Sequence, residues 1–297
     1  MHSLATIDYA IIISFLGLSL LAGVIMTKRA STSLDQYYLG GRSLPWYLLG
    51  VAGMAHWFDL TGTMVITSFL YMLGPRGLYV EFRGGAGLLL IFMLAYTGKW
   101  HRRSGCMTQA EWMTYRFGEG KAAEVLRLIT ALVNIVLTIM MLAYLIRGAS
   151  LFLGMFFPFP AMYTTLILIA VSTLFTVSAG FYGVVLTDLV QGIIILASSI
   201  IIAILAWNLI PSSANLADTA RQVTGNIDWV NSRPAWHTQM PAGYETYSPL
   251  IMVAMFYLLR NMLGGMGAGA EPRYFGAKSD RDCGLQSLLQ GVMLMFR

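Results

Sequence analysis

The sequence predicts an all-α integral membrane protein that crosses the bilayer several times. Hydrophobic residues make up 57% of the 297 residues, charged residues make up only 11%, and the mean hydropathy is +0.67. A soluble domain carries about 25% charged residues, so this composition excludes that class. Eight apolar runs separated by polar segments are the second observation, because a spanning helix needs about 20 mostly apolar residues.

The third observation is the placement of the basic residues. With the N-terminus outside, the connections on the inner side carry eleven Lys and Arg residues and those on the outer side carry three. This asymmetry is the positive-inside pattern of membrane proteins. Topology therefore accounts for the net charge of +5, and we expect no nucleic-acid partner. The inner set is Lys28, Arg29, Arg42, Lys99, Arg102, Arg103, Arg116, Lys121, Arg273, Lys278 and Arg281, and the outer set is Arg76, Arg221 and Arg233.

The first apolar run covers residues 7–27. No basic residue precedes it, and Lys28 and Arg29 follow it directly. A cleaved signal peptide carries its positive charge in front of the apolar run, so we expect a retained helix. A polar connection over residues 31–42 leads to the next run, which Pro45 is well placed to start.

The second run, residues 43–73, carries polar and small residues near its middle. His56 and Asp59 lie there, with Gly50, Gly53 and Gly62 on either side. A carboxylate at the centre of a span is costly unless an ion, a partner or water compensates its charge. We expect a helix that opens inside the membrane, where free carbonyls suit a cation and free N–H groups suit an anion.

The rest of the chain alternates apolar and polar segments. The basic segment 99–121 has aromatic residues between its charges, and we expect it to lie at the membrane surface, partly as an amphipathic helix. The expected elements are a span at 78–98, this surface segment, a long helix at 122–156, spans at 161–178 and 184–207 joined by the turn 179–183, a polar external loop, a span at 249–270, a polar stretch at 271–282 and a helix from 283 onward.

Three motifs resemble those of the sodium/solute symporters, a family of sugar, proline, pantothenate and sialic-acid carriers. They are DQYYLGGRSLPW at residues 35–46, SAGFYGVVLTDLVQ at 178–191 and PRYFGAKS at 272–279. Their order and spacing agree with the family, so the resemblance covers essentially the whole chain.

The resemblance implies a leucine-transporter-type core, in which five helices are repeated with inverted topology after one extra helix. Residues 7–27 would form the extra N-terminal helix, 43–207 the first five-helix repeat, 208–248 the external loop and 249–297 the start of the second repeat. The C-terminal part of the second repeat would be missing. Family members are commonly much longer, so we expect a fragment.

The resemblance also implies a sodium site at the opened helix. Asp59 matches the polar position beside the family's sodium site, and the main-chain carbonyls of Trp57 and Leu60 would coordinate the ion, a hard cation that prefers oxygen ligands. Asp59 could instead cap the broken helix or pair with an arginine. Asp188, in the Thr-Asp motif, could assist ion release or only cap a helix.

The positions implied to contact the solute depart from the pattern of sugar carriers. Met64, Arg260 and Leu263 stand where sugar carriers have glutamine, asparagine and tyrosine, whereas Glu81 falls at their sugar-binding glutamate. A sugar hydroxyl without its partner costs about 1–3 kcal/mol, and a guanidinium binds carboxylates through two hydrogen bonds. We therefore favour a solute that carries a carboxylate. The full implied set is Asp59, Thr63, Met64, Glu81, Arg260 and Leu263.

Structural roles stay open for the charged members of this set. Glu81 could pair with Arg83, and Arg260 could neutralise an acidic side chain. We expect Arg147, a second intramembrane cation, to neutralise Asp59, Glu81 or Glu271.

The predicted function is sodium-coupled secondary active symport of a small solute, an amino acid or organic acid, across the plasma membrane. Sodium is the coupling ion, no organic cofactor is expected, and the partners are the solute, sodium and the lipid bilayer. A transporter-like sensor domain of a signalling protein is the alternative. No Gly-x-Ser-x-Gly or His-Glu-x-x-His motif supports an enzyme.

Overall fold

A computed structural model describes residues 5–81, 87–157, 159–209, 216–233, 235–264 and 271–296. Throughout these ranges the regular elements are α-helices and short 3₁₀ helices, and one isolated bridge pairs Leu44 with Ala277. The prediction of an all-α protein is confirmed. The elements are α1 (Thr6–Ala30), α2 (Leu34–Leu39), η1 (Gly40–Arg42), α3 (Trp46–His56), α4 (Leu60–Leu73), η2 (Gly74–Gly77), α5 (Leu78–Glu81), α6 (Gly87–Arg103), α7 (Gln109–Phe117), α8 (Lys121–Leu153), α9 (Ala161–Leu209), α10 (Leu216–Thr224), η3 (Glu245–Tyr247), α11 (Leu250–Gly264), α12 (Pro272–Phe275) and α13 (Asp280–Phe296).

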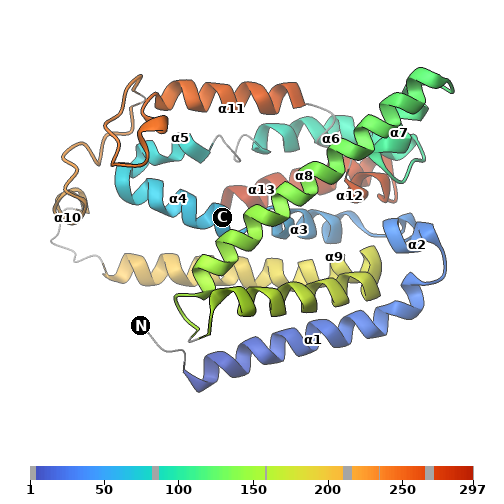
Figure 1. The fold of residues 1–297 in the computed structure, drawn as a ribbon, viewed down its shortest axis with the longest axis horizontal. Coiled ribbons are helices and arrows are strands. Elements are labelled where there is room, and N and C mark those ends of the chain that lie inside the picture. The colour runs from blue at the N-terminus through green and yellow to red at the C-terminus, as the bar shows by residue number, and fades with distance from the viewer. Residues whose placement is uncertain are drawn as a thin grey trace.

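Three of the described helices are long and apolar enough to cross a membrane, Thr6–Lys28 within α1, α8 and α9, and Leu250–Arg260 is a shorter apolar helix. Helix α9 consists of two arms, because Gly180 has φ 59° and ψ −173° and reverses the chain. The arms run antiparallel (Figure 1). This confirms two spans joined by a turn at 179–183.

Most of the long helices lie side by side in successive layers, and α8 crosses them obliquely (Figure 1). Helix α1 packs on α9, α9 packs on α3, and α13 fills the space between α3 and α6. Small residues allow the close approach at α3. A Cβ at Gly50 would lie 2.9 Å from Leu289 of α13, and a Cβ at Gly192 of α9 would lie 2.8 Å from Val51. Helix α3 is therefore held on two sides.

Several boundaries differ from the sequence expectation. The polar connection at 31–42 is mostly helical, because Ser33 caps α2 by accepting the Gln36 N–H and Gly40 ends it with φ 61°. The third run is divided into α5 and α6, with residues 82–86 between them outside the described ranges. The last helix begins at Asp280, three residues earlier than the first apolar residue of its run.

The two ends of the layered structure differ in charge. We call the end formed by α2, η1, the last turn of α6, α7 and α12 the basic end, and the opposite end, formed by η2, α10 and η3, the loop end (Figure 1). The eleven predicted inner basic residues lie in α7, η1 and α12, next to α12, or at those ends of α1, α6, α8 and α13 that reach the basic end. Arg76 of η2 and Arg221 of α10 lie at the loop end, and Arg76 Nε donates to Arg233 O at 3.0 Å.

Candidate functional site

The second apolar run contains a break between two helices. Helix α3 ends at His56 and α4 begins at Leu60. The N–H of Trp57 donates to Met54 O at 3.2 Å and the N–H of Phe58 to Ala55 O at 3.0 Å, so α3 closes with tightened turns. Asp59 then adopts an extended conformation, with φ −115° and ψ 143°. The prediction that this helix is opened near its middle is confirmed.

Asp59 caps α4. Its carboxylate accepts the N–H of Gly62, and its main-chain carbonyl accepts the Thr63 hydroxyl at 2.8 Å. A carboxylate is favourable there because the first N–H groups of a helix have no intrahelical acceptor and carry partial positive charge. Glycine at position 62 leaves room for the carboxylate, since a Cβ there would lie 2.7 Å from Asp59 Oδ2. The capping alternative is therefore confirmed, and a sodium role for Asp59 stays a prediction.

The first turn of α4 is positioned by a contact with α8 that sequence reasoning missed. A Cβ at Gly148 would overlap the Thr61 side chain, so the two helices touch at this point. The Thr61 hydroxyl oxygen is buried, and no residue of the described part hydrogen-bonds to it. The available signal was Gly148 itself, the single glycine inside the apolar helix Lys121–Leu153.

The predicted solute positions are only partly brought together. Thr63 and Met64 are half-buried on the first turns of α4, next to the break. Arg260 is exposed on α11, which packs on α5 and α6. Within the described ranges, neither a hydrogen bond nor an ion pair joins Arg260 to the break. The side chains of Glu81 and Leu263 lie outside the described residues.

Asp188 takes part in a buried group of charges. It lies inside the second arm of α9, so it caps no helix. Its Oδ2 lies 3.7 Å from Arg273 Nη2, and Arg273 Nη1 donates to Glu271 Oε2 at 2.7 Å. The Arg273 side chain is 8% exposed. Of the three acidic partners expected for Arg147, Glu271 pairs with Arg273 instead, and Arg147 itself is exposed on α8.

Arginine side chains at the basic end join two of the three family-like motifs. Arg42 donates to Asp35 Oδ1 at 3.0 Å, to Phe275 O at 3.3 Å and to Gly105 O at 2.8 Å. Arg102 donates to Ala277 O at 3.0 Å and Lys278 O at 2.9 Å. Residues 35–46 and 272–279 thus meet, although more than 200 residues separate them along the chain.

Asp280, the first residue of α13, completes this arrangement. Its carboxylate accepts hydrogen bonds from Arg103 at 2.7 Å and from Arg102 at 3.1 Å. The hydrogen bond from Arg103, together with the positive charges of both arginines, holds the pKa of Asp280 below its usual value. The N-terminus of α13 is therefore fastened to the end of α6 by charge.

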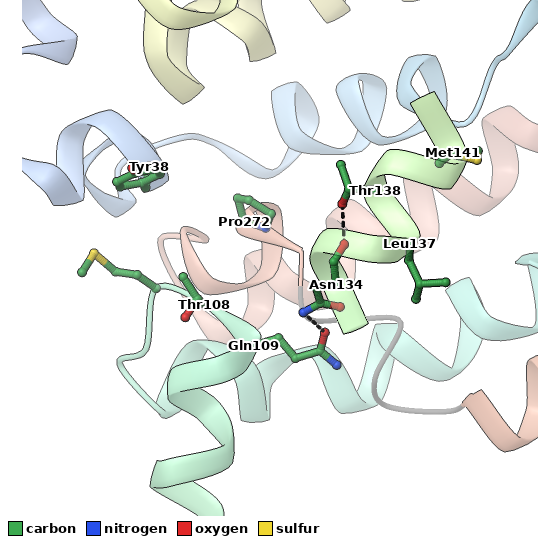
Figure 2. Close-up of a pocket in the computed structure, with 9 residues that line it drawn as sticks. Tyr38, Thr108, Gln109, Asn134, Leu137, Thr138, Met141 and Pro272 are labelled. Carbon is green, nitrogen blue, oxygen red and sulfur yellow. Dashed lines mark hydrogen bonds between the residues drawn. The ribbon is translucent and has the colours of Figure 1, made fainter. Parts of the chain in front are cut away.

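An open surface pocket of about 490 Å³ lies near the basic end, away from the break. Its lining is amide, hydroxyl and apolar groups, and Asn134 Nδ2 donates to Gln109 Oε1 across it at 3.2 Å (Figure 2). The lining residues are Tyr38, Met107, Thr108, Gln109, Asn134, Leu137, Thr138, Met141 and Pro272. None of the residues predicted to bind sodium or solute lines it.

Sequence relatives include a solute carrier family 5 member and two sodium cotransporters. Solute carrier family 5 member 4 from Rattus norvegicus is 26% identical over 207 residues, which cover 67% of this chain and 29% of that protein. The sodium/mannose cotransporter SLC5A10 from Bos taurus is 24% identical, and the match covers 74% of this chain and 36% of that protein. The sodium/myo-inositol cotransporter from Canis lupus familiaris is 26% identical, and the match covers 68% of this chain and 28% of that protein. The chain spans about a third of the length of these relatives.

One solved structure has a similar fold, a substrate-bound outward-open state of a Na+-coupled sialic acid symporter. The TM-score is 0.74 at 17% sequence identity, and the match covers 98% of this chain and 57% of that chain. This chain therefore shares the fold of the matching part of that protein. The family model that describes the sodium:solute symporter family matches residues 37–296, which include the broken helix and nearly all of the three motifs, and this chain belongs to that family.

Proposed function

We propose that the protein carries out sodium-coupled secondary active symport of a small solute across the plasma membrane, with its N-terminus outside. The observation that carries the proposal is the break at Trp57–Asp59, in a chain that belongs to the sodium:solute symporter family. At this break the C-terminal end of α3, which is partly negative, meets a carboxylate. Both features favour a bound cation.

Sodium would be held by the main-chain carbonyls of Trp57 and Leu60 and by the Asp59 carboxylate. Carbonyl and carboxylate oxygens are the ligands that hard cations prefer. If 43–207 forms the first repeat of a leucine-transporter-type arrangement, such a site would lie at the junction of the repeats. Sodium then stabilises one arrangement of the transporter and raises its affinity for the solute, and the sodium gradient drives accumulation through this coupling free energy.

The solute that we propose carries a carboxylate, and Arg260 would bind it. Arg260 is exposed on α11, and no carboxylate of the described residues pairs with it. Thr63 and Met64, beside the break, would line the same site together with Glu81 and Leu263. Asp188, in the second arm of α9, would lie on the path by which sodium leaves toward the basic end.

A neutral sugar or polyol is the second candidate. The mannose and myo-inositol cotransporters among the relatives favour it, at 24% and 26% identity. Against it stand Met64 and Leu263, because each apolar side chain would leave a sugar hydroxyl without a partner at a cost of about 1–3 kcal/mol. Arg260 also puts a positive charge where the sugar carriers have a neutral asparagine.

Uptake measurements with the full-length protein test both points. Radiolabelled amino acids, organic acids, hexoses and inositols are compared in sodium and in choline buffer. We expect uptake only in sodium, with a carboxylate solute preferred, and a rise of about tenfold or more in its half-saturation concentration for Arg260→Gln, because hydrogen bonds to charged groups contribute about 1.5–3 kcal/mol. Equal uptake in choline contradicts symport, and a preference for hexose contradicts the carboxylate assignment.

A further inference from the structure

Arg273 is the buried charge that the proposed transport cycle does not use. It shares its guanidinium between two carboxylates, one on its own segment and one on α9. These three side chains sum to one negative charge, so the guanidinium cannot fully neutralise both carboxylates at once. Charges that are poorly exposed to water interact strongly with any cation that comes close.

The two ion pairs of Arg273 are unequal. The distance to Glu271 is 2.7 Å, a full charge-assisted hydrogen bond, whereas the distance to Asp188 is 3.7 Å. Arg273 Nε has no hydrogen-bond partner in the described part of the chain, and neither does Asp188 Oδ2. Glu271 therefore holds the guanidinium near Asp188 without completing the second pair.

The segment that carries Arg273 is fixed to α13. The Arg273 carbonyl accepts the Gln286 side-chain N–H at 3.3 Å, and the hydroxyls of Tyr274 and Ser287 are 2.8 Å apart. Tyr274 is 2% exposed and Phe275 is fully buried. Because α12 is anchored in this way, the weak contact to Asp188 is the part of the group that can change without disturbing the packing.

We propose that Arg273 is a positioning residue for sodium release, which takes over the Asp188 carboxylate as the ion leaves. The inference rests on the proposed function, in which Asp188 lies on the release path. A sodium ion on the path competes with the guanidinium for Asp188, and the return of Arg273 prevents the carboxylate from retaining the ion. Glu271 weakens this competition by holding Arg273 on the other side.

The test measures sodium activation of solute uptake and the maximal rate in the full-length protein. Arg273→Gln leaves Asp188 without a competing cation, so we expect the sodium half-saturation concentration to fall at least about fivefold while the maximal rate also falls. Arg273→Lys keeps the charge and should restore much of the rate. Glu271→Gln frees the guanidinium for Asp188 and should shift the half-saturation concentration in the opposite direction.

The controls separate this role from a structural one. The double variant Asp188→Asn/Arg273→Gln should have the same sodium half-saturation concentration as Asp188→Asn alone. If Arg273→Gln does not fold, Glu271→Gln carries the test, and an unchanged half-saturation concentration there overturns the inference. A loss of rate without any change in sodium affinity also overturns it. If wild-type uptake needs no sodium, the proposed function itself is wrong, which is a different result.

Discussion

The two halves of the broken helix are held in different ways. Helix α3 is buried along most of its length, Gly50 and Gly53 face α13, and Gly192 of α9 lies against Val51. Of α4, only Phe69 and Leu73 are buried within the described residues. Phe69 contacts the rings of Tyr244 and Tyr247, at centroid distances of 5.7 and 5.0 Å.

Helix α4 is fastened at its C-terminal end by hydrogen bonds from the loop between α10 and η3. Asn226 donates to Met72 O at 2.9 Å, and Trp229 Nε1 donates to Tyr71 O at 3.0 Å. These bonds satisfy carbonyls that have no partner at a helix end. The comparison shows that one half depends on helix packing and the other on caps at both of its ends, so different substitutions should loosen each half.

The largest effect is expected for Gly74→Ala, at the cap of α4. Gly74 has φ 61° and ψ −142°, and a Cβ there would overlap the Trp229 carbonyl. Backbone strain and the displaced loop together should lower the free energy of unfolding by about 2–4 kcal/mol. Thermal unfolding in detergent measures this loss.

Gly105→Ala is the matched control for this variant. Gly105 has φ 71°, and a Cβ added there would meet nothing within 4 Å, so the alanine should cost only the backbone strain. Equal losses in the two variants would show that the loop does not fasten α4.

A smaller effect is expected for Gly50→Ala, on the packed half. The added methyl would lie 2.9 Å from Leu289 Cδ2 and 3.1 Å from Gln286 O, so α13 must shift. Overpacking of this kind costs about 1–3 kcal/mol. The same change at Gly17 of α1 meets nothing within 4 Å and should be neutral or slightly stabilising, because alanine favours helices. A neutral Gly50→Ala variant would contradict the close packing of α3 on α13.

The smallest effect concerns the charged fastening of α13, the helix that supports α3. The pKa of Asp280 is lowered in the folded protein by Arg103 and Arg102. A lowered folded pKa adds stability above the unfolded value, about 3.9, and this stability is lost as the pH falls through the folded pKa. We expect the thermal midpoint to fall with pH below about 4, and less so in Asp280→Asn. Identical pH profiles would show that this ion pair does not contribute, as many exposed pairs do not.

The sequence was sufficient for the class of fold and for the location of the break. Apolar runs and a central carboxylate flanked by glycines reflect local physical requirements, which is why the opening at Trp57–Asp59 was predictable. The reversal at Gly180 was predictable for the same reason, since only the turn separated two apolar runs.

The contacts between distant segments could not be predicted. The Arg273–Asp188 pair joins residues on two helices, and the Thr61–Gly148 contact joins two others, so both depend on how the helices pack. The order and spacing of the motifs did not indicate that two of them meet at the basic end. The sequence also did not distinguish the two roles open to Asp59, because an aspartate serves equally as a helix cap and as a cation ligand.

The most direct test of the sodium site compares Asp59→Asn with Asp59→Ala in sodium-activated uptake by the full-length protein. Asparagine caps helices about as well as aspartate, so this variant removes the charge and keeps the cap, whereas alanine removes both. If the Asp59 carboxylate binds sodium, Asp59→Asn should fold like the wild type and need at least about tenfold more sodium for half-maximal uptake. Wild-type sodium activation in Asp59→Asn, together with a loss of stability in Asp59→Ala, would contradict the sodium site. Asp59 would then only cap α4.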